Sequence, residues 1–114
     1  MATREENQSE GGVVVERKTE KKTARPHLYK VLFHNDDFTT MEFVVAVLQQ
    51  VFHHSETSAT VIMMNVHRTG IGIAGVYTRE IAETKVAQTM ELAREAEFPL
   101  QVTMEPDDDP DESD

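Results

Sequence analysis

The stretch Leu28–Phe43, LYKVLFHNDDFTTMEF, contains a change of hydrophobic period that decides the fold. Apolar and aromatic residues alternate through Leu28–His34, a pattern that predicts a strand. The short polar side chains of Asn35–Asp37 favour a turn and end that strand. The residues that follow recur at helical spacing and predict an amphipathic helix: Met41, Val44, Val45, Leu48, Val51 and Phe52.

The start of this helix resembles a capping box. Thr39 is the predicted N-cap, whose side chain would accept a hydrogen bond from an unpaired backbone N–H, and Glu42 would reach back to Thr39. A second helix is predicted between Ser55 as its N-cap and Gly70 as its stop. Its inward stripe comprises Ala59, Ile62, Met63 and Val66.

The remainder of the chain predicts two more strands and one more helix. Ile71–Tyr77 has the pattern of a strand, in which Gly72 and Gly75 allow a close backbone approach or a bulge. Thr78 is the predicted cap of a third helix, which must end before Phe98–Pro99 because proline disfavours a helical residue ahead of it. The inward residues of this helix are Ala82, Val86, Met90 and Ala93, and the last strand alternates through Leu100, Val102 and Met104.

The predicted order is therefore β-α-α-β-α-β, and it indicates a two-layer α+β domain. Three strands form a mainly antiparallel sheet, with the three helices packed on one face. The domain is predicted over residues 26–105. Residues 1–25 are polar and predict a flexible arm, although their valine run Val13–Val15 could add to a sheet edge, and residues 106–114 predict a disordered acidic tail.

Composition excludes several classes of function. The chain has 11 basic and 21 acidic residues, a net charge of −10, so it would repel phosphate backbones and anionic membrane surfaces. It has no cysteine, which excludes disulfides, thiolate metal sites and cysteine nucleophiles. No apolar stretch resembles a signal peptide or a membrane span. We expect a soluble, cytoplasmic, monomeric protein that binds neither nucleic acid nor membrane.

The candidate site consists of Asn35, Asp36, Asp37 and His67. Taken alone, the first three are typical of a helix-entry turn, and a lone histidine near a helix end is typical of a surface position. If the topology brings them together, their oxygens and imidazole nitrogen suit an ammonium group, which has three donors to satisfy. The neighbouring helical stripes would supply an apolar wall, which on its own is equally typical of a core: Met41, Val44, Met63 and Val66.

Two other interpretations of the sequence are an enzyme and a metal-binding protein. Asp36, Asp37 and His67 could act as acid–base groups, but no nucleophile, phosphate-binding or cofactor motif accompanies them. His53 and His54, with His34, could bind zinc, but adjacent histidines at a helix end point apart. We therefore expect no catalysis, no metal and no cofactor.

Several blocks of the chain resemble the ClpS adaptor family, over about residues 25–105. The first block contains Tyr29-Lys30-Val31, Asn35-Asp36-Asp37-Phe38-Thr39 and Met41-Glu42-Phe43-Val44. The others are Val66-His67, Gly75-Val76-Tyr77-Thr78, Ala82-Glu83-Thr84-Lys85-Val86 and Ala93-Arg94-Glu95. The ribosomal stalk protein has a C-terminal domain of similar fold, which leaves a general interaction domain as the alternative.

The resemblance implies a non-enzymatic adaptor that carries proteins with N-terminal Leu, Phe, Tyr or Trp, called N-degrons, to the ClpA–ClpP protease. It implies that Asn35, Asp36, Asp37 and His67 hold the α-amino group and first peptide unit. Glu80 and Lys85 would dock on the N-terminal domain of ClpA, and the arm would be engaged by the unfoldase. The side-chain pocket would be lined by Phe33, Thr39, Met41, Val44, Met63, Val66 and Leu100, with Met41 rejecting β-branched residues.

The chain departs from the family pattern at three positions. Thr40 stands where the family commonly has proline at the first helical position, so some pre-organisation of the helix is lost. His34 stands where an apolar residue is usual, and Phe33 is bulkier than the usual aliphatic residue. A phenylalanine in the pocket would reduce its volume and shift the preference among large side chains.

Overall fold

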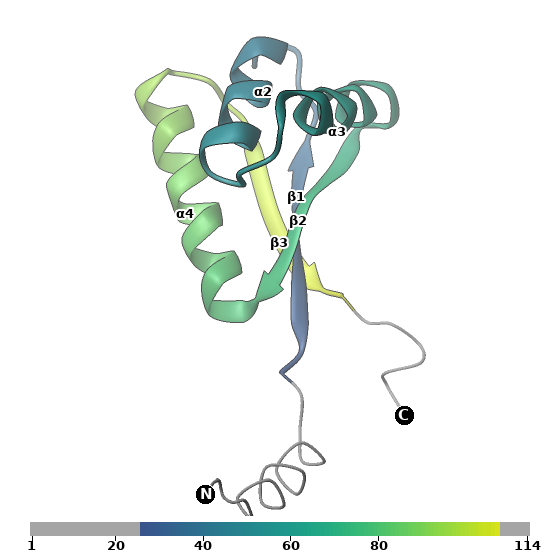
Figure 1. Cartoon of the computed structure of the whole chain (residues 1–114). Helices are drawn as coiled ribbons and strands as arrows, with labels where there is room; N and C mark the ends of the chain where they lie inside the picture. The colour runs from purple at the N-terminus through teal and green to yellow at the C-terminus, as the bar shows by residue number, and fades with distance from the viewer. Residues whose placement is uncertain (1–25, 108–114) are drawn as a thin grey trace, which may run out of the picture.

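The computed structural model describes residues 26–107. Its elements follow the predicted order β-α-α-β-α-β, and the predicted fold class is confirmed (Figure 1). They are β1 Leu28–His34, α2 Met41–Gln50, α3 Glu56–Thr69, β2 Ile71–Thr78, α4 Arg79–Glu95 and β3 Gln101–Pro106.

The sheet has the order β2-β1-β3, and both pairings are antiparallel. β1 is the central strand, with Leu28 opposite Thr78 at one end and His34 opposite Ile71 at the other. The register shifts between Val31 and Leu32, because β2 carries one extra residue there. This irregularity lies beside Gly75, one of the two glycines that predicted a bulge.

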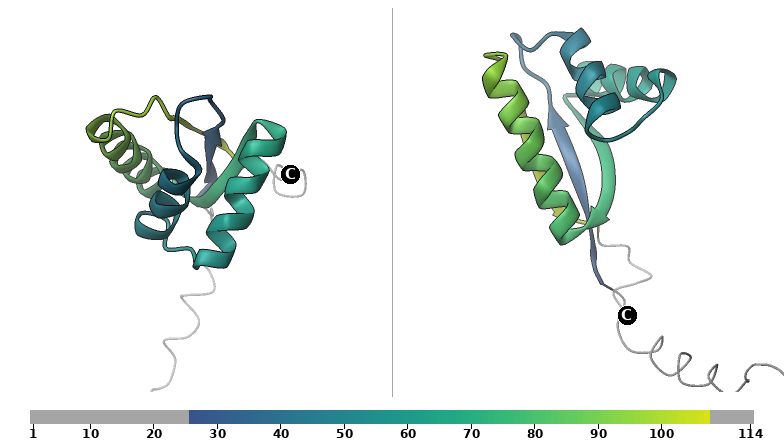
Figure 2. Two further views of the ribbon diagram at one scale, coloured as in Figure 1. Left: turned by 90° about the horizontal axis from the view of Figure 1, so that it is seen from above. Right: turned by 60° about the vertical axis from the view of Figure 1, so that its left-hand side comes forward.

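α4 lies along one face of the sheet, the α2–α3 pair lies across one end of it, and within residues 26–107 no helix runs along the face opposite α4 (Figure 2). α4 contacts all three strands, α3 packs against β2, and α2 packs against α3. The core between these layers includes Phe33 and Phe52, whose rings meet edge to face with centroids 5.5 Å apart. The long α4 therefore covers the sheet, while the α2–α3 pair covers one end of it.

One predicted core position in α4 is wrong. Met90 is half exposed, and its neighbour Thr89 is fully buried instead. The buried stripe of α4 is Ala82, Thr89 and Ala93, so it contains small residues that allow the helix to lie close to the sheet.

The helix caps are partly as predicted. Ser55 caps α3 by accepting from the backbone N–H of Ser58, and Gly70 ends that helix with φ 95°, as predicted. The prediction for α2 is wrong by one residue, since Thr40 rather than Thr39 is the N-cap and accepts from Phe43 N–H. Thr40 is thus the cap itself and not the first helical residue. Thr78 has the N-cap position of α4, but its side chain makes no cap hydrogen bond.

β3 extends to Pro106, one residue past the predicted end of the domain, and Asp107 N–H donates to Leu28 carbonyl oxygen over 2.8 Å. The predicted arm, residues 1–25, and residues 108–114 of the predicted tail lie outside the described residues. Within residues 26–107, no helix is long and apolar enough to cross a bilayer.

Candidate binding site

A cavity of about 350 Å³ opens where β1 ends, between the first turn of α2 and the last turns of α3. All four residues of the predicted polar cluster line it, and so do five of the predicted apolar or threonine wall residues. Thr40 is the only lining residue that the sequence did not predict. The full lining comprises Asn35, Asp36, Asp37, Thr39, Thr40, Met41, Val44, Met63, Val66 and His67.

The antiparallel pairing of β1 with β2 brings the two halves of the site together. β2 begins directly after α3, so the pairing of His34 with Ile71 places the end of β1 beside the end of α3. Asn35 N–H donates to the carbonyl oxygen of Gly70, the cap of α3, over 2.9 Å. His67 lies in the last turn of the same helix. The Asn35–Asp37 turn and His67 therefore lie together at the mouth of the cavity.

A glycine allows α3 to pack close enough to complete the cavity wall. A Cβ atom on Gly72 would lie 2.6 Å from Cγ2 of Val66, so any larger residue at this place in β2 would push α3 away. Val66 and Met63 are buried on this face of α3. Their positions in the wall therefore depend on the missing side chain of Gly72.

The carboxylate of Asp36 holds the turn. One of its oxygens accepts from the N–H groups of Phe38 and Thr39 over 2.8 and 2.7 Å, and the other accepts from the Thr39 hydroxyl over 2.8 Å. Burial acts to raise the pKa of Asp36, but these three hydrogen bonds together outweigh it and place the pKa below its usual value of 3.8. This network also explains why Thr39 does not cap α2.

The adjacent Asp37 is in a different situation. It is exposed at the mouth, and none of the side-chain hydrogen bonds within residues 26–107 involves its carboxylate. Asn35 and His67 are exposed at the same mouth. The rim therefore offers an amide oxygen, a carboxylate and an imidazole nitrogen to a group entering from solvent.

The interior of the cavity is apolar. Val44, Met63 and Val66 are buried in its wall, whereas Met41 is 45% exposed and stands at the entrance. Methionine is flexible and polarisable, so Met41 can adjust to the shape of an entering side chain.

Two residues predicted for the wall lie elsewhere. Phe33 is fully buried in the core against Phe52, and Leu100 is buried just before β3. Neither lines the cavity. Phe33 has its side chain on the inner face of the sheet, and Phe52 follows α2, so the ring fills the space between the layers. The ring of Phe33 therefore does not enter the cavity.

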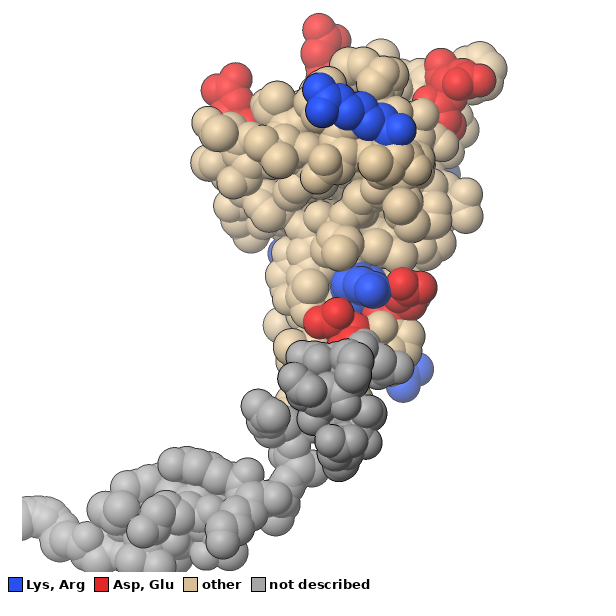
Figure 3. All heavy atoms as spheres, turned by 90° about the vertical axis from the view of Figure 1, so that its right-hand side faces the viewer, with Lys and Arg blue, Asp and Glu red and all other residues tan. Residues whose placement is uncertain are grey.

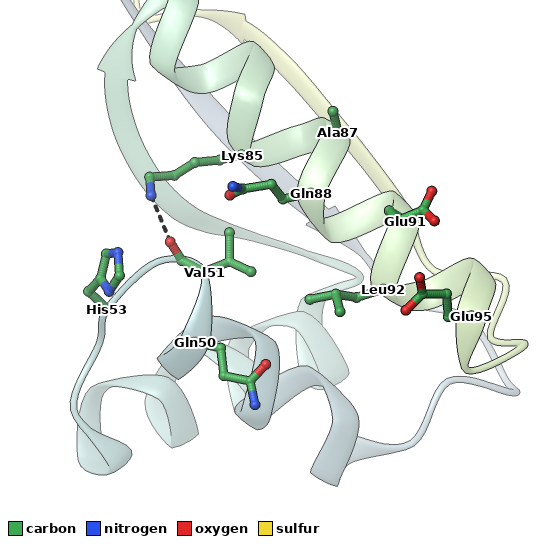
Figure 4. Close-up of a pocket in the computed structure, with 9 residues that line it drawn as sticks. All are labelled: Gln50, Val51, His53, Lys85, Ala87, Gln88, Glu91, Leu92 and Glu95. Atoms are coloured by element: carbon green, nitrogen blue, oxygen red, sulfur yellow. Dashed lines mark hydrogen bonds between the residues drawn. The ribbon is translucent and has the colours of Figure 1, made fainter.

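A larger, open groove of about 680 Å³ lies between the end of α2 and α4 and contains Lys85 (Figure 4). The Lys85 ammonium donates to the carbonyl oxygen of Val51 over 2.7 Å and lies 5.8 and 5.4 Å from the ring centroids of Phe52 and Tyr77. Lys85 thus ties α4 to the end of α2. Glu80, the other predicted docking residue, is exposed in the first turn of α4.

The histidines do not form a metal site in the described part of the chain. An imidazole nitrogen of His34 lies 2.8 Å from the Thr103 hydroxyl, and the Nε2–H of His54 donates to Ala74 carbonyl oxygen over 2.6 Å. No group of three His, Asp or Glu side chains within residues 26–107 is placed to hold a metal ion. The metal-binding alternative therefore finds no support in the geometry.

Fold and cavity together define a small α+β domain with a polar mouth over an apolar interior. The sequence model of one family, "ATP-dependent Clp protease adaptor protein ClpS", matches residues 24–103. The chain is 49% identical over 108 residues to the ClpS adapter protein of Myxococcus xanthus, covering 95% of this chain and 99% of that protein. It is 52% identical over 109 residues to that of Phenylobacterium zucineum, covering 94% and 100%.

A solved structure agrees with these relatives. ClpS2 of Agrobacterium tumefaciens, bound to L-phenylalaninamide, is 48% identical to this chain and superimposes with a TM-score of 0.70, covering 73% of this chain and all of that one. The chain belongs to the ClpS family. It is an adaptor protein of the ATP-dependent Clp protease and not an enzyme.

Proposed function

We propose that this adaptor binds N-degrons, taking the first residue of a protein into the cavity at the end of β1. The observation that carries the proposal is that the Asn35–Asp37 turn and His67 lie together at the mouth of a cavity whose interior is apolar. The ligand of the Agrobacterium relative supports it, because phenylalaninamide has a free α-amino group and an aromatic side chain.

The α-ammonium group would be held at the rim by the Asn35 side-chain oxygen, the Asp37 carboxylate and the His67 imidazole. Asp36 already accepts three hydrogen bonds within its turn, so its role is to hold that turn in place. An ammonium group needs several acceptors when it leaves water, and each charge-assisted hydrogen bond contributes about 1.5–3 kcal/mol before entropic costs.

The side chain of the first residue would enter between α2 and α3, against Val44, Met63 and Val66. Burial of a Leu or Phe side chain contributes roughly 1.5–3 kcal/mol. Together with the rim contacts, and after the cost of association, this supports affinities in the micromolar range, on the order of −8 kcal/mol. Met41 at the entrance would reject the branched Cβ of Ile and Val.

Delivery would follow by docking of the adaptor on the N-terminal domain of ClpA through the surface around Glu80 and Lys85. The arm before Pro26 would then be engaged by the unfoldase. We further infer that the adaptor acts as a cytoplasmic monomer. Because Lys85 also holds Val51, its replacement would disturb both folding and docking, and Glu80 is the cleaner test of the docking surface.

Fluorescence anisotropy with peptides that differ only in their first residue tests the proposal. We expect peptides that begin with Leu, Phe, Tyr or Trp to bind at least about tenfold more tightly than peptides that begin with Ile, Val or Ala. Val66→Ser should weaken every tight complex, whereas Val61→Ser, an exposed valine on the same helix outside the cavity, should leave affinity unchanged. Similar affinities for Leu and Ala peptides would refute the proposed pocket.

A further inference from the structure

The open side of the sheet carries exposed aliphatic side chains on β2. Ile71, Ile73 and Val76 are 42, 48 and 40% exposed, and we call them the β2 patch. On β1 they pair with His34, Leu32 and Lys30, respectively. These positions alternate with the buried Val31 and Phe33, so the β2 patch lies on the face of the sheet opposite α4. Seen from this side, the middle of the domain is a broad face without charged side chains (Figure 3).

A hollow of about 370 Å³ adjoins the β2 patch. Its floor is Leu32, only 6% exposed, with Ile71 and Ile73 beside it, and its further lining comes from Asn65, Thr69 and Gly72. An apolar floor with a polar border accepts a small aliphatic side chain from solvent.

β2 is also an unprotected edge strand. Within residues 26–107 it pairs only with β1. Its eight residues, IGIAGVYT, contain no charge and no proline, the features by which proteins usually keep an edge from pairing. The other edge strand, β3, has Glu105 and Pro106. An apolar, uncharged edge strand of this length favours association with another apolar segment.

We propose that the valine run Val13–Val15 of the same chain packs on the β2 patch. It is the only apolar run in residues 1–25. The arm continues into β1, whose first residue Leu28 pairs with Thr78, so the arm joins the domain beside the C-terminal end of β2. The ten residues between Val15 and Pro26 span up to about 33 Å. Ile73 lies five residues from Thr78, about 17 Å along the strand, which is well within that reach.

A tethered segment suits this patch better than a second copy of the chain does. Three partly exposed side chains fall far short of the ~800 Å² that each partner buries in a stable interface. A segment joined by a short linker experiences an effective concentration in the millimolar range, so even a weak contact is well occupied. The inference does not depend on N-degron binding.

Paramagnetic relaxation measurements on the full chain test this contact directly. The chain has no cysteine, so Gly12→Cys provides a single site for a nitroxide label next to Val13. We expect the amide signals of Ile71–Val76 to lose most of their intensity, while those of Glu91 and its neighbours in α4 keep theirs. Serine at Val13, Val14 and Val15 together should restore the β2 signals.

Two controls distinguish packing of the chain's own valine run on the β2 patch from packing of a second copy of the chain. Ile73→Ser should abolish the broadening, whereas Val61→Ser, a change of similar exposure on α3, should not. In a mixture of isotope-labelled chain without nitroxide and unlabelled chain with it, the β2 signals should stay sharp. Broadening in that mixture would show a second copy on the patch and overturn the proposal. Three other results would also overturn it: β2 signals that stay broadened after the serine substitutions, broadening of another surface in place of β2, and no broadening at all.

Discussion

Asp36 and Asp37 are neighbouring carboxylates with different surroundings, and the difference assigns them different tasks. Asp36 accepts three hydrogen bonds within its own turn, whereas Asp37 is exposed at the cavity mouth. Asp36→Ala should lower the free energy of unfolding by about 1–2 kcal/mol, because two backbone N–H groups lose their acceptor. Asp37→Ala should leave unfolding nearly unchanged and weaken peptide binding. Urea denaturation and peptide titration of both variants check this, and the opposite division of effects would contradict it.

The lowered pKa of Asp36 gives the turn a defined dependence on pH. Because the folded state holds the ionised form, the contribution of Asp36 to stability is fully present above its unfolded pKa, near 3.8, and is lost as the pH falls through the lowered folded value. The stability difference between the wild type and Asp36→Ala should therefore be constant near neutral pH and shrink below about pH 4. A difference that stays constant into strong acid would contradict this.

Thr89 is a buried hydroxyl with no hydrogen-bond partner among the described residues. Thr89→Val should raise the free energy of unfolding by about 1 kcal/mol, because an unsatisfied polar atom is removed at nearly constant shape. Thr84→Val is the matched control on the same helix; its hydroxyl is exposed and donates to Glu80, and its effect should stay within about 0.5 kcal/mol. A destabilised Thr89→Val protein in thermal or urea unfolding would show that the hydroxyl has a partner.

Two of the sequence-based predictions, the cap of α2 and one core position of α4, miss by one residue. Thr39 and Thr40 are both good N-caps, and only the hydrogen bond from the Thr39 hydroxyl to Asp36 leaves the cap to Thr40. Met90 has the more apolar side chain, but the small Thr89 permits the close approach of α4. Residue type predicts what can occupy a position, and packing against distant residues decides between neighbours.

At the scale of the element, the two threonines that begin α2 and α4 form a natural comparison. Thr40 and Thr78 have similar N-cap backbone angles, but only Thr40 accepts a hydrogen bond from its helix. Thr40→Ala should cost about 1 kcal/mol in unfolding free energy. Thr78→Ala should cost clearly less. Chemical denaturation of the two variants checks this, and equal losses would show that the Thr40 hydrogen bond contributes nothing.

The elements themselves could be predicted from the sequence because their periods and stop signals are strong. Gly70 ends α3 where predicted, and α4 ends at Glu95, before Phe98 and Pro99, as predicted. The meeting of the Asn35–Asp37 turn with His67 could not be derived from spacing alone. It depends on the antiparallel pairing of β1 with β2, which carries the end of α3 to the end of β1. The placement of Phe33 outside the cavity likewise depends on the packing of Phe52.

At the scale of the whole molecule, the candidate site and the attachment points of the terminal segments lie at opposite ends of β1. Leu28 lies beside Asp107 at one end, and the cavity mouth follows His34 at the other. Seven residues of strand separate these ends by roughly 23 Å. A bound substrate and an arm drawn toward an unfoldase would therefore not compete for the same surface, as the proposed delivery requires.

The affinity of the full chain for one peptide, with its N-terminus either free or acetylated, tests the central claim most directly. Acetylation removes the charge and two donors of the α-amino group and leaves Asp37 and His67 without their partner. A peptide that begins with a free Phe should bind in the micromolar range, and its acetylated form about tenfold or more weakly. Equal affinities would contradict a site built around the charged start of a polypeptide.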